Sequence, residues 1–158
     1  MIILGIDPGT ATTGFGVIKK NDQDLTAIDF GIIATVPKDN ASKRLEKIFK
    51  ETSTLFKKVK PNLIVIERLY FFKNLKTALP VAEARGVILL ATQKCKIKTI
   101  ELTPLEVKMG ICGYGRADKR QVQKMVKETL KMEKIPKPDD AADALALAIC
   151  GALKTRCG

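Results

Sequence analysis

The chain has 158 residues, a length that fits one compact domain, and we expect residues 1–158 to form it. Its 28 basic and 17 acidic residues give a net charge of +11, which favours a polyanionic partner such as nucleic acid over an anionic membrane surface. The chain has no histidine, which excludes a His-dependent triad, a histidine general base and a phosphohistidine. Charge alone does not separate a nucleic-acid enzyme from a ribosome-associated or simply alkaline protein.

The cysteines and the hydropathy pattern indicate the compartment. Cysteines at 95, 112, 150 and 157 never form a Cys-x-x-Cys spacing, so we expect reduced, mostly buried thiols rather than a zinc site or a disulfide framework. No apolar run approaches the roughly 20 residues of a membrane span. The first residues carry no basic leader and no cleavage site. We therefore expect a cytoplasmic protein without membrane association.

The first third of the chain predicts three strands. Residues 2–6 are nearly all apolar, which is typical of a strand buried on both faces, and they end at a turn sequence that begins with Asp7. Residues 14–18 and 25–34 predict the second and third strands, with a polar turn at 21–24 between them. Because the links are short, an antiparallel meander is favoured.

Helices and strands alternate after residue 40. Apolar residues recur at helical spacing over 40–60 until Pro61, and an apolar strand at 63–66 then ends in Glu67. Pro80 cannot lie inside a helix without cost, so we expect the next helix to begin there, with a longer loop before it. The remaining predicted elements are a helix at 82–92, a strand at 97–102, and helices at about 104–110, 119–132 and 139–153.

Carboxylates end two of the predicted strands. Asp7 follows the first strand and Glu67 follows the strand at 63–66. In α/β sheets the functional crevice lies at the carboxyl ends of parallel strands, so these two side chains meet there if their strands are parallel neighbours.

The last predicted helix carries a second acidic pair. Asp140 and Asp143 share a face at i,i+3 spacing, but Asp139 and Asp143 share one at i,i+4, so spacing alone leaves the choice open. Asp139 follows Pro138 and could simply cap the helix. Clustered carboxylates must be protonated, paired with lysine or bridged by cations, and an all-oxygen site selects Mg²⁺ or Mn²⁺. The alternative is that these acids merely end strands and cap a helix.

Three motifs together resemble the RuvC family of Holliday-junction resolvases. They are Gly5-Ile6-Asp7-Pro8-Gly9-Thr10 with Thr13-Gly14-Phe15-Gly16, then Ile64-Val65-Ile66-Glu67, then Asp140-Ala141-Ala142-Asp143-Ala144-Leu145-Ala146. The first motif alone also opens actin-like ATPases, which need two such domains, whereas the ordered set of three spans nearly the whole chain.

The resemblance implies a fold and an activity. The fold is α/β and RNase H-like, a mixed five-stranded sheet flanked by helices. The activity is a structure-selective endonuclease that resolves four-way DNA junctions by paired Mg-dependent nicks in opposing strands. The resemblance assigns catalysis and metal binding to Asp7, Glu67, Asp140 and Asp143, and thereby chooses Asp140 over Asp139. Mg²⁺ is the implied cofactor, with Mn²⁺ as a substitute and two ions per site.

The resemblance also implies partners and DNA contacts. The partners are four-way junction DNA, a second copy of the chain that packs through the helix at 82–92, and a RuvA/RuvB branch-migration complex. Tyr70 matches an aromatic that inserts at the junction, whereas Phe71 and Phe72 could equally form a hydrophobic clamp. Lys108 and Lys119 are placed near the scissile phosphate.

The residues themselves add one DNA-contact prediction. Asp118 and Gln121 have the spacing of a capping box, which starts a helix with Lys119 and Arg120 in its first turn. Because the helix dipole disfavours cations there, the pattern indicates a bound phosphate, with a solvated charged face as the alternative.

Two other functions stay open. A YqgF-type RNase H-like nuclease that acts on RNA precursors also begins with a Gly-Ile-Asp turn, but the final acidic helix and the aromatic segment favour the resolvase. A module that holds junctions without cutting them would not need four carboxylates near polyanionic DNA.

Overall fold

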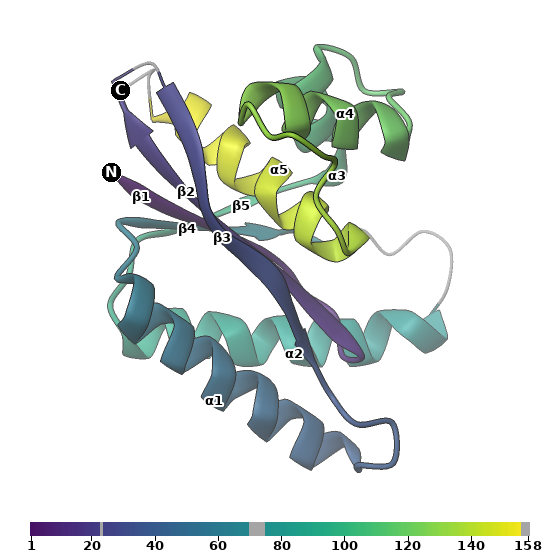
Figure 1. The fold of residues 1–158 in the computed structure, drawn as a ribbon. Helices are drawn as coiled ribbons and strands as arrows, with labels where there is room; N and C mark the ends of the chain where they lie inside the picture. The colour runs from purple at the N-terminus through teal and green to yellow at the C-terminus, as the bar shows by residue number, and fades with distance from the viewer. Residues whose placement is uncertain (23, 70–74, 156–158) are drawn as a thin grey trace.

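One mixed sheet organises the protein. The computed structural model describes residues 1–22, 24–69 and 75–155 (Figure 1). Its five strands follow the order β3-β2-β1-β4-β5. They are β1 (Ile2–Asp7), β2 (Thr12–Asn21), β3 (Asp24–Ala34), β4 (Leu63–Glu67) and β5 (Thr99–Leu102). The first three pair antiparallel, whereas β4 pairs parallel with both β1 and β5, so the predicted meander and mixed sheet are confirmed.

Helices cover both faces of the sheet. Figure 1 shows α1 (Ala41–Val59) and α2 (Leu75–Lys94) on one face, and α3 (Pro104–Cys112), α4 (Lys119–Thr129) and α5 (Asp139–Lys154) on the other. Leu63 and Val65 of β4 join the apolar cluster on the α5 side, whereas Ile64 and Ile66 join the cluster on the α1 and α2 side. The strand is therefore apolar at four successive positions because both of its faces are buried.

The helix starts follow local capping chemistry. The Asn40 side chain accepts a hydrogen bond from the Lys43 backbone N–H at the start of α1. Asp118 and Gln121 form the predicted capping box of α4, with both hydrogen bonds at 2.8 Å. A second capping box, Thr103 with Glu106, starts α3.

Two glycines allow α5 to lie directly on the sheet. A Cβ atom on Gly5 of β1 would lie 1.9 Å from the Ala144 carbonyl oxygen, and one on Gly14 of β2 would lie 2.1 Å from the Asp140 carbonyl oxygen. Any side chain at these positions would push the helix away. The close approach carries the start of α5 to the end of β1.

The predicted start of the second long helix was wrong. Helix α2 begins at Leu75, and Pro80 lies inside it. Proline lacks the N–H that would bond to the fourth preceding carbonyl, which weakens but does not end the helix. The Pro80 carbonyl instead accepts a hydrogen bond from the Thr10 hydroxyl at 2.7 Å, and α2 packs along α1. Tertiary packing thus outweighs one lost backbone bond.

The thiols and the helix lengths agree with the sequence expectations. Within the described residues Cys95 and Cys112 are half-buried free thiols and Cys150 is a buried one. Among the described helices, none combines the length and hydrophobicity that crossing a bilayer requires.

Candidate active site

The strand-end carboxylates lie side by side. The parallel register of β1 and β4 pairs Ile6 with Ile66, so Asp7 and Glu67 are the next residues on neighbouring strands. Both strands end at the same edge of the sheet, as the sequence predicts for a parallel pair. Both side chains are half-buried.

Asp140 and Asp143 of α5 approach Asp7 from the face of the sheet that α5 covers. One carboxylate oxygen each of Asp7, Asp140 and Asp143 lies within 4.8 Å of the others. The Thr12 hydroxyl at the start of β2 donates a short hydrogen bond to Asp140. Glu67 lies outside this group of three but is close enough for its charge to act on Asp7.

Burial and mutual repulsion shift the acidities of this cluster. Burial, followed by the charges of Glu67, Asp143 and Asp140, raises the pKa of Asp7 to about 8 against the opposing effect of Lys119. Burial and the charge of Asp143 raise the pKa of Glu67 to about 6. Burial also raises the pKa of Asp143. The folded protein therefore holds more negative charge here than it can easily accommodate.

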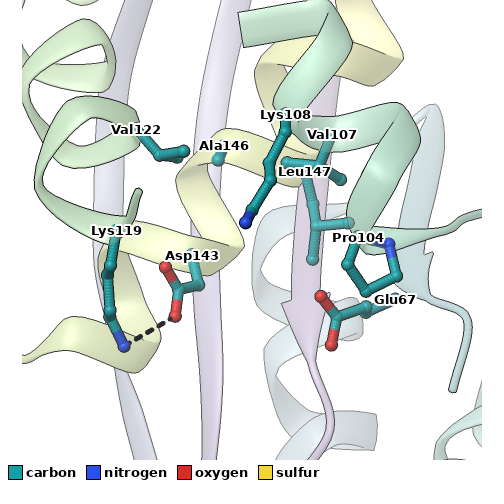
Figure 2. Close-up of a pocket in the computed structure, with 9 residues that line it drawn as sticks. All are labelled: Glu67, Pro104, Val107, Lys108, Lys119, Val122, Asp143, Ala146 and Leu147. Atoms are coloured by element: carbon teal, nitrogen blue, oxygen red, sulfur yellow. Dashed lines mark ion pairs between the residues drawn. The ribbon is translucent and has the colours of Figure 1, made fainter. Parts of the chain in front are cut away.

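Lys119 partly offsets that charge. Its ammonium group lies 3.1 Å from an Asp143 carboxylate oxygen, the contact drawn in Figure 2. Partial burial opposes protonation of Lys119, but the hydrogen bond and charge of Asp143, with those of Asp139, raise its pKa overall. The predicted first-turn cation thus balances a carboxylate of the site.

Asp139 does not belong to the cluster. It is the first residue of α5, where Pro138 occupies the capping position without a side-chain hydrogen bond, so the expectation that Asp139 caps the helix was wrong. Its carboxylate points outward to Lys137 at 2.9 Å and to Lys119 at 3.5 Å. Of the two residues that spacing left open, Asp140 is the one that reaches Asp7.

A cavity of about 200 Å³ opens beside Glu67 and Asp143. Figure 2 shows Lys108 of α3 and Lys119 of α4 on its walls, with Val107, Val122, Ala146 and Leu147 forming an apolar lining. Both predicted lysines therefore flank the acidic cluster. Arg120 is exposed on α4 and does not line this cavity, and Tyr70 lies outside the described residues.

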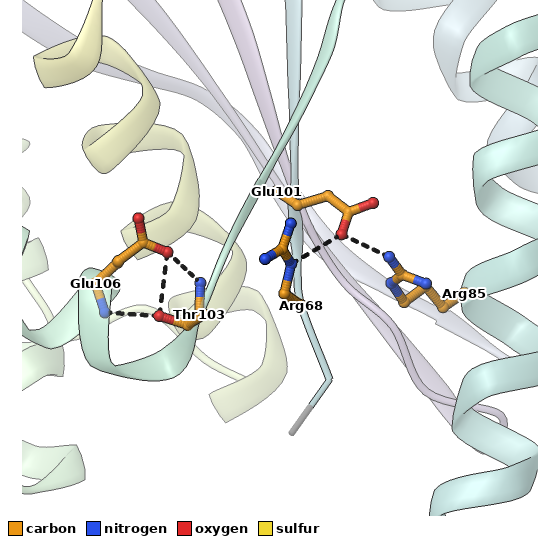
Figure 3. A network of polar contacts seen from close by, with 5 residues as sticks. All are labelled: Arg68, Arg85, Glu101, Thr103 and Glu106. Atoms are coloured by element: carbon orange, nitrogen blue, oxygen red, sulfur yellow. Dashed lines mark hydrogen bonds and ion pairs between the residues drawn. The ribbon is translucent and has the colours of Figure 1, made fainter. Parts of the chain in front are cut away.

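An ion-pair network that sequence reasoning missed supports the end of β4. Glu101 of β5 accepts hydrogen bonds from Arg85 of α2 at 2.6 Å and from Arg68 at 3.4 Å (Figure 3). Arg68 directly follows Glu67, so the network ties the strand end to a neighbouring strand and to α2. Thr12 was also missed, because only the fold brings it to Asp140.

The donor set of the cluster fits a hard divalent cation. The three grouped carboxylates offer only oxygen ligands, which suit Mg²⁺ or Mn²⁺ rather than zinc. Burial, followed by the charges of the neighbouring carboxylates, raises the pKa of Asp7, and a bound cation would favour its ionised form. Glu67 follows Ile66 on the neighbouring strand and lies outside the group of three.

Known proteins match the chain over almost its full length. Residues 3–151 match the family described as crossover junction endodeoxyribonuclease RuvC. A protein of that name from Thermosipho melanesiensis is 51% identical over 156 residues, 99% of each chain.

Solved structures agree with this match. The Thermus thermophilus RuvC structure superposes with a TM-score of 0.91 at 28% identity, covering 100% of this chain and 97% of that one. T. thermophilus RuvC in complex with Holliday junction substrate gives the same TM-score and coverage at 26% identity. The fold is accordingly RNase H-like, and the chain belongs to the RuvC family of crossover junction endodeoxyribonucleases.

Proposed function

We propose that this protein is a structure-selective endonuclease that resolves four-way DNA junctions by paired, Mg²⁺-dependent nicks in opposing strands. The observation that carries the proposal is the carboxylate group of Asp7, Asp140 and Asp143, whose oxygens lie within 4.8 Å of one another at the end of a sheet. The relative from T. melanesiensis is named as a crossover junction endodeoxyribonuclease, and T. thermophilus RuvC binds a Holliday junction.

Four carboxylates are the proposed metal ligands: Asp7, Glu67, Asp140 and Asp143. Mg²⁺, or Mn²⁺ in its place, with two ions per site, supplies activation of the attacking water and stabilisation of the leaving oxygen. Thr12 holds the Asp140 carboxylate through its hydroxyl. Lys119 balances Asp143 before substrate arrives, and Lys108 and Lys119 then contact the scissile phosphate.

Further DNA contacts and partners complete the proposal. Arg120 contacts the DNA backbone from the exposed start of α4, and Tyr70 inserts at the junction. The chain acts as one nuclease domain in the cytoplasm and receives junctions from a RuvA/RuvB branch-migration complex.

A homodimer supplies the two active sites that paired nicks need. The outward face of α2 carries Leu79 and Leu90, which are 67% and 55% exposed, with Gly86 between them open to close approach. An apolar stripe with a central glycine suits a two-fold helix contact. Two equivalent sites related by such an axis match a junction with two equivalent strands.

The test compares three substrates with the full-length protein. Synthetic four-way junction, linear duplex of the same sequence and structured RNA are each incubated with Mg²⁺ and with a chelator, and the nicks are mapped. We expect symmetric nicks in opposing strands of the junction only, and only with Mg²⁺. Cutting of the RNA alone would favour the RNA-processing alternative, and junction binding without any cutting would favour a non-catalytic binding module.

A further inference from the structure

A second cavity lies on the other flank of the acidic cluster. It has a volume of about 400 Å³ and is lined by the turn after β1, by Pro80 and Val81 of α2, and by Arg44 of α1. Asp7 and Asp140 form part of the same wall lining. Among the lining residues that the structure describes, Arg44 is the single basic one.

The Arg44 guanidinium is oriented by two partly buried hydrogen bonds. Its Nε donates to the Thr35 hydroxyl oxygen at 2.8 Å, and the Thr35 hydroxyl donates to the Thr10 carbonyl oxygen at 2.6 Å. Thr35 is only 9% exposed, so this connection is well shielded from water. Because Nε is used for the contact with Thr35, the two terminal nitrogens keep their donors for another acceptor.

Arg44 has no carboxylate partner within the described residues, in contrast to three of the five lysines of α1, and unlike the unpaired Lys43 and Lys57 it lines the cavity. Lys47 pairs with Glu51, Lys50 with Glu46 and Lys58 with Asp29, so these lysines form surface ion pairs. Throughout residues 1–22, 24–69 and 75–155, no ion pair involves Arg44. An oriented, half-buried and unneutralised arginine beside a nuclease site is suited to a bidentate contact with a phosphate.

The two cavities give the acidic cluster a cationic group on each side. Lys108 and Lys119 line the cavity beside Glu67 and Asp143, whereas Arg44 lines the cavity beside Asp7 and Asp140. A nucleic-acid strand whose scissile phosphate lies over the carboxylates extends into both cavities and carries a phosphate in each direction. Asp7 and Asp140 would repel that neighbouring phosphate, and Arg44 is the described lining residue whose charge opposes this repulsion.

We propose that Arg44 binds the phosphate adjacent to the scissile one on the nicked strand, in the cavity bounded by the turn after β1 and by the start of α1. This assignment rests on the proposed nuclease function and extends it. The ligand is a backbone phosphodiester, so the contact fixes the strand's position without reading its sequence.

The experiment neutralises single phosphates and single side chains in combination. Junctions carry one methylphosphonate, an uncharged phosphate analogue, at each of the three positions on either side of the cut. Single-turnover cleavage with Mg²⁺ is measured for the wild type, Arg44→Ala, Arg44→Lys and Lys43→Ala. Lys43 is the matched control because it is the exposed preceding residue, carries the same charge and does not line the cavity.

At one of the flanking positions, the effect of a methylphosphonate on the cleavage rate should depend on Arg44. In the wild type we expect neutralisation of that phosphate to slow cleavage about tenfold, the loss for one charge-assisted contact. Arg44→Ala should cleave the unmodified junction about tenfold more slowly than the wild type. A methylphosphonate at the Arg44-dependent position should not slow this variant any further. Lys43→Ala should keep the wild-type profile, and Arg44→Lys should retain part of the sensitivity because it keeps the charge but not the fork.

The opposite profile overturns the assignment. If Arg44→Ala and Arg44→Lys remain as sensitive as the wild type at every position, Arg44 acts only through its contact with Thr35. If the wild type fails to cut even the unmodified junction, the proposed nuclease function fails first and the Arg44 assignment falls with it.

Discussion

The two strand-end carboxylates and the two helix carboxylates meet at one site but are supported differently. Asp7 and Glu67, here called the strand pair, are placed by the register of neighbouring parallel strands. Burial, with nearby negative charges, raises their pKa values to about 8 and about 6. Asp140 and Asp143, called the helix pair, are placed by a helix that docks onto the sheet, and each has a donor from the protein, Thr12 and Lys119 respectively.

This difference shows where the site depends most on a cation. The helix pair is partly satisfied by the protein's own donors, Thr12 and Lys119, although burial still raises the pKa of Asp143. For Asp7, no side-chain hydrogen bond or ion pair is found within the described part of the chain, and burial followed by the charges of three carboxylates raises its pKa. A divalent ion should therefore act mainly on the strand pair, and the predictions below test that expectation.

The largest effect is expected for Asp7→Asn, which removes a charge from the strand pair and keeps its shape. We expect Mg²⁺-dependent cleavage of a four-way junction to fall by about three orders of magnitude or more, since the central metal ligand is lost. Junction binding should be preserved, because removal of one negative charge does not weaken phosphate contacts. Cleavage kinetics and a gel-shift titration in chelator measure the two effects separately.

Nicking by Asp7→Asn at the wild-type rate would mean that the ion is held without the strand pair. In that case the greater dependence of Asp7 and Glu67 on a cation would not affect cleavage, and the assignment of Asp7 as a metal ligand would be wrong.

The second prediction displaces the helix pair from the strand pair. A Cβ on Gly14 would lie 2.1 Å from the Asp140 backbone oxygen, so Gly14→Ala must push the start of α5 outward. We expect a loss of about 1–3 kcal/mol in the free energy of unfolding, and a drop in cleavage approaching 100-fold, because misplacement by about 1 Å has effects of that order. Urea unfolding and single-turnover cleavage measure the two losses.

Gly31→Ala is the matched control for this displacement. Its added Cβ would lie 3.1 Å from the end of the Phe15 ring, and no atom of α5 is among those that it would meet. We expect nearly wild-type cleavage from Gly31→Ala. Equal losses from both substitutions would show that Gly14 matters for the sheet in general rather than for placing Asp140.

The third prediction concerns pH in the absence of metal. The unfolded Asp7 side chain loses its proton near pH 4, whereas the folded one keeps it to about pH 8. Between these values the unfolded state binds fewer protons than the folded state, so stability falls as pH rises. Glu67 adds to the fall up to about pH 6. In chelator, the wild type should therefore lose on the order of a few kcal/mol of stability relative to Asp7→Asn over this range, given about 1.4 kcal/mol per pKa unit.

Urea titrations at closely spaced pH values measure this loss. Saturating Mg²⁺ at pH 8 should restore the stability of the wild type and change that of Asp7→Asn little, because only the wild type gains strong binding. Parallel pH curves for the two proteins would mean that Asp7 carries no special share of the repulsion.

The sequence predicts the strand pair better than the helix pair for a physical reason. Apolar runs that end in Asp7 and Glu67 are local patterns, and the parallel arrangement places both ends at one edge. The rotation of α5 instead depends on its contact with Gly14, which is distant in the chain. Spacing alone therefore could not choose between Asp139 and Asp140, and the family resemblance made that choice.

The other features that the sequence did not predict also depend on contacts between residues that are distant in the chain. Thr12 meets Asp140 across 128 residues, and Arg44 meets Thr35 across a turn whose path the sequence does not specify. Pro80 was expected to start α2 because local rules disfavour an interior proline, but packing on α1 and the hydrogen bond from Thr10 hold the helix through it. Side-chain partners of this kind follow only once the fold is known.

The smallest effect is expected at the residue next to the helix pair. Asp139 contacts Lys137 and Lys119 with a carboxylate that is 46% exposed, and surface ion pairs of this kind contribute about 0–1 kcal/mol. We expect Asp139→Asn to change junction cleavage by less than about twofold and to leave the urea unfolding midpoint nearly unchanged. Asp140→Asn, the same substitution one residue along, should lose cleavage as Asp7→Asn does. The reverse result, with activity lost at 139 and kept at 140, would require α5 to dock in a different rotation and would replace Asp140 by Asp139 in the helix pair.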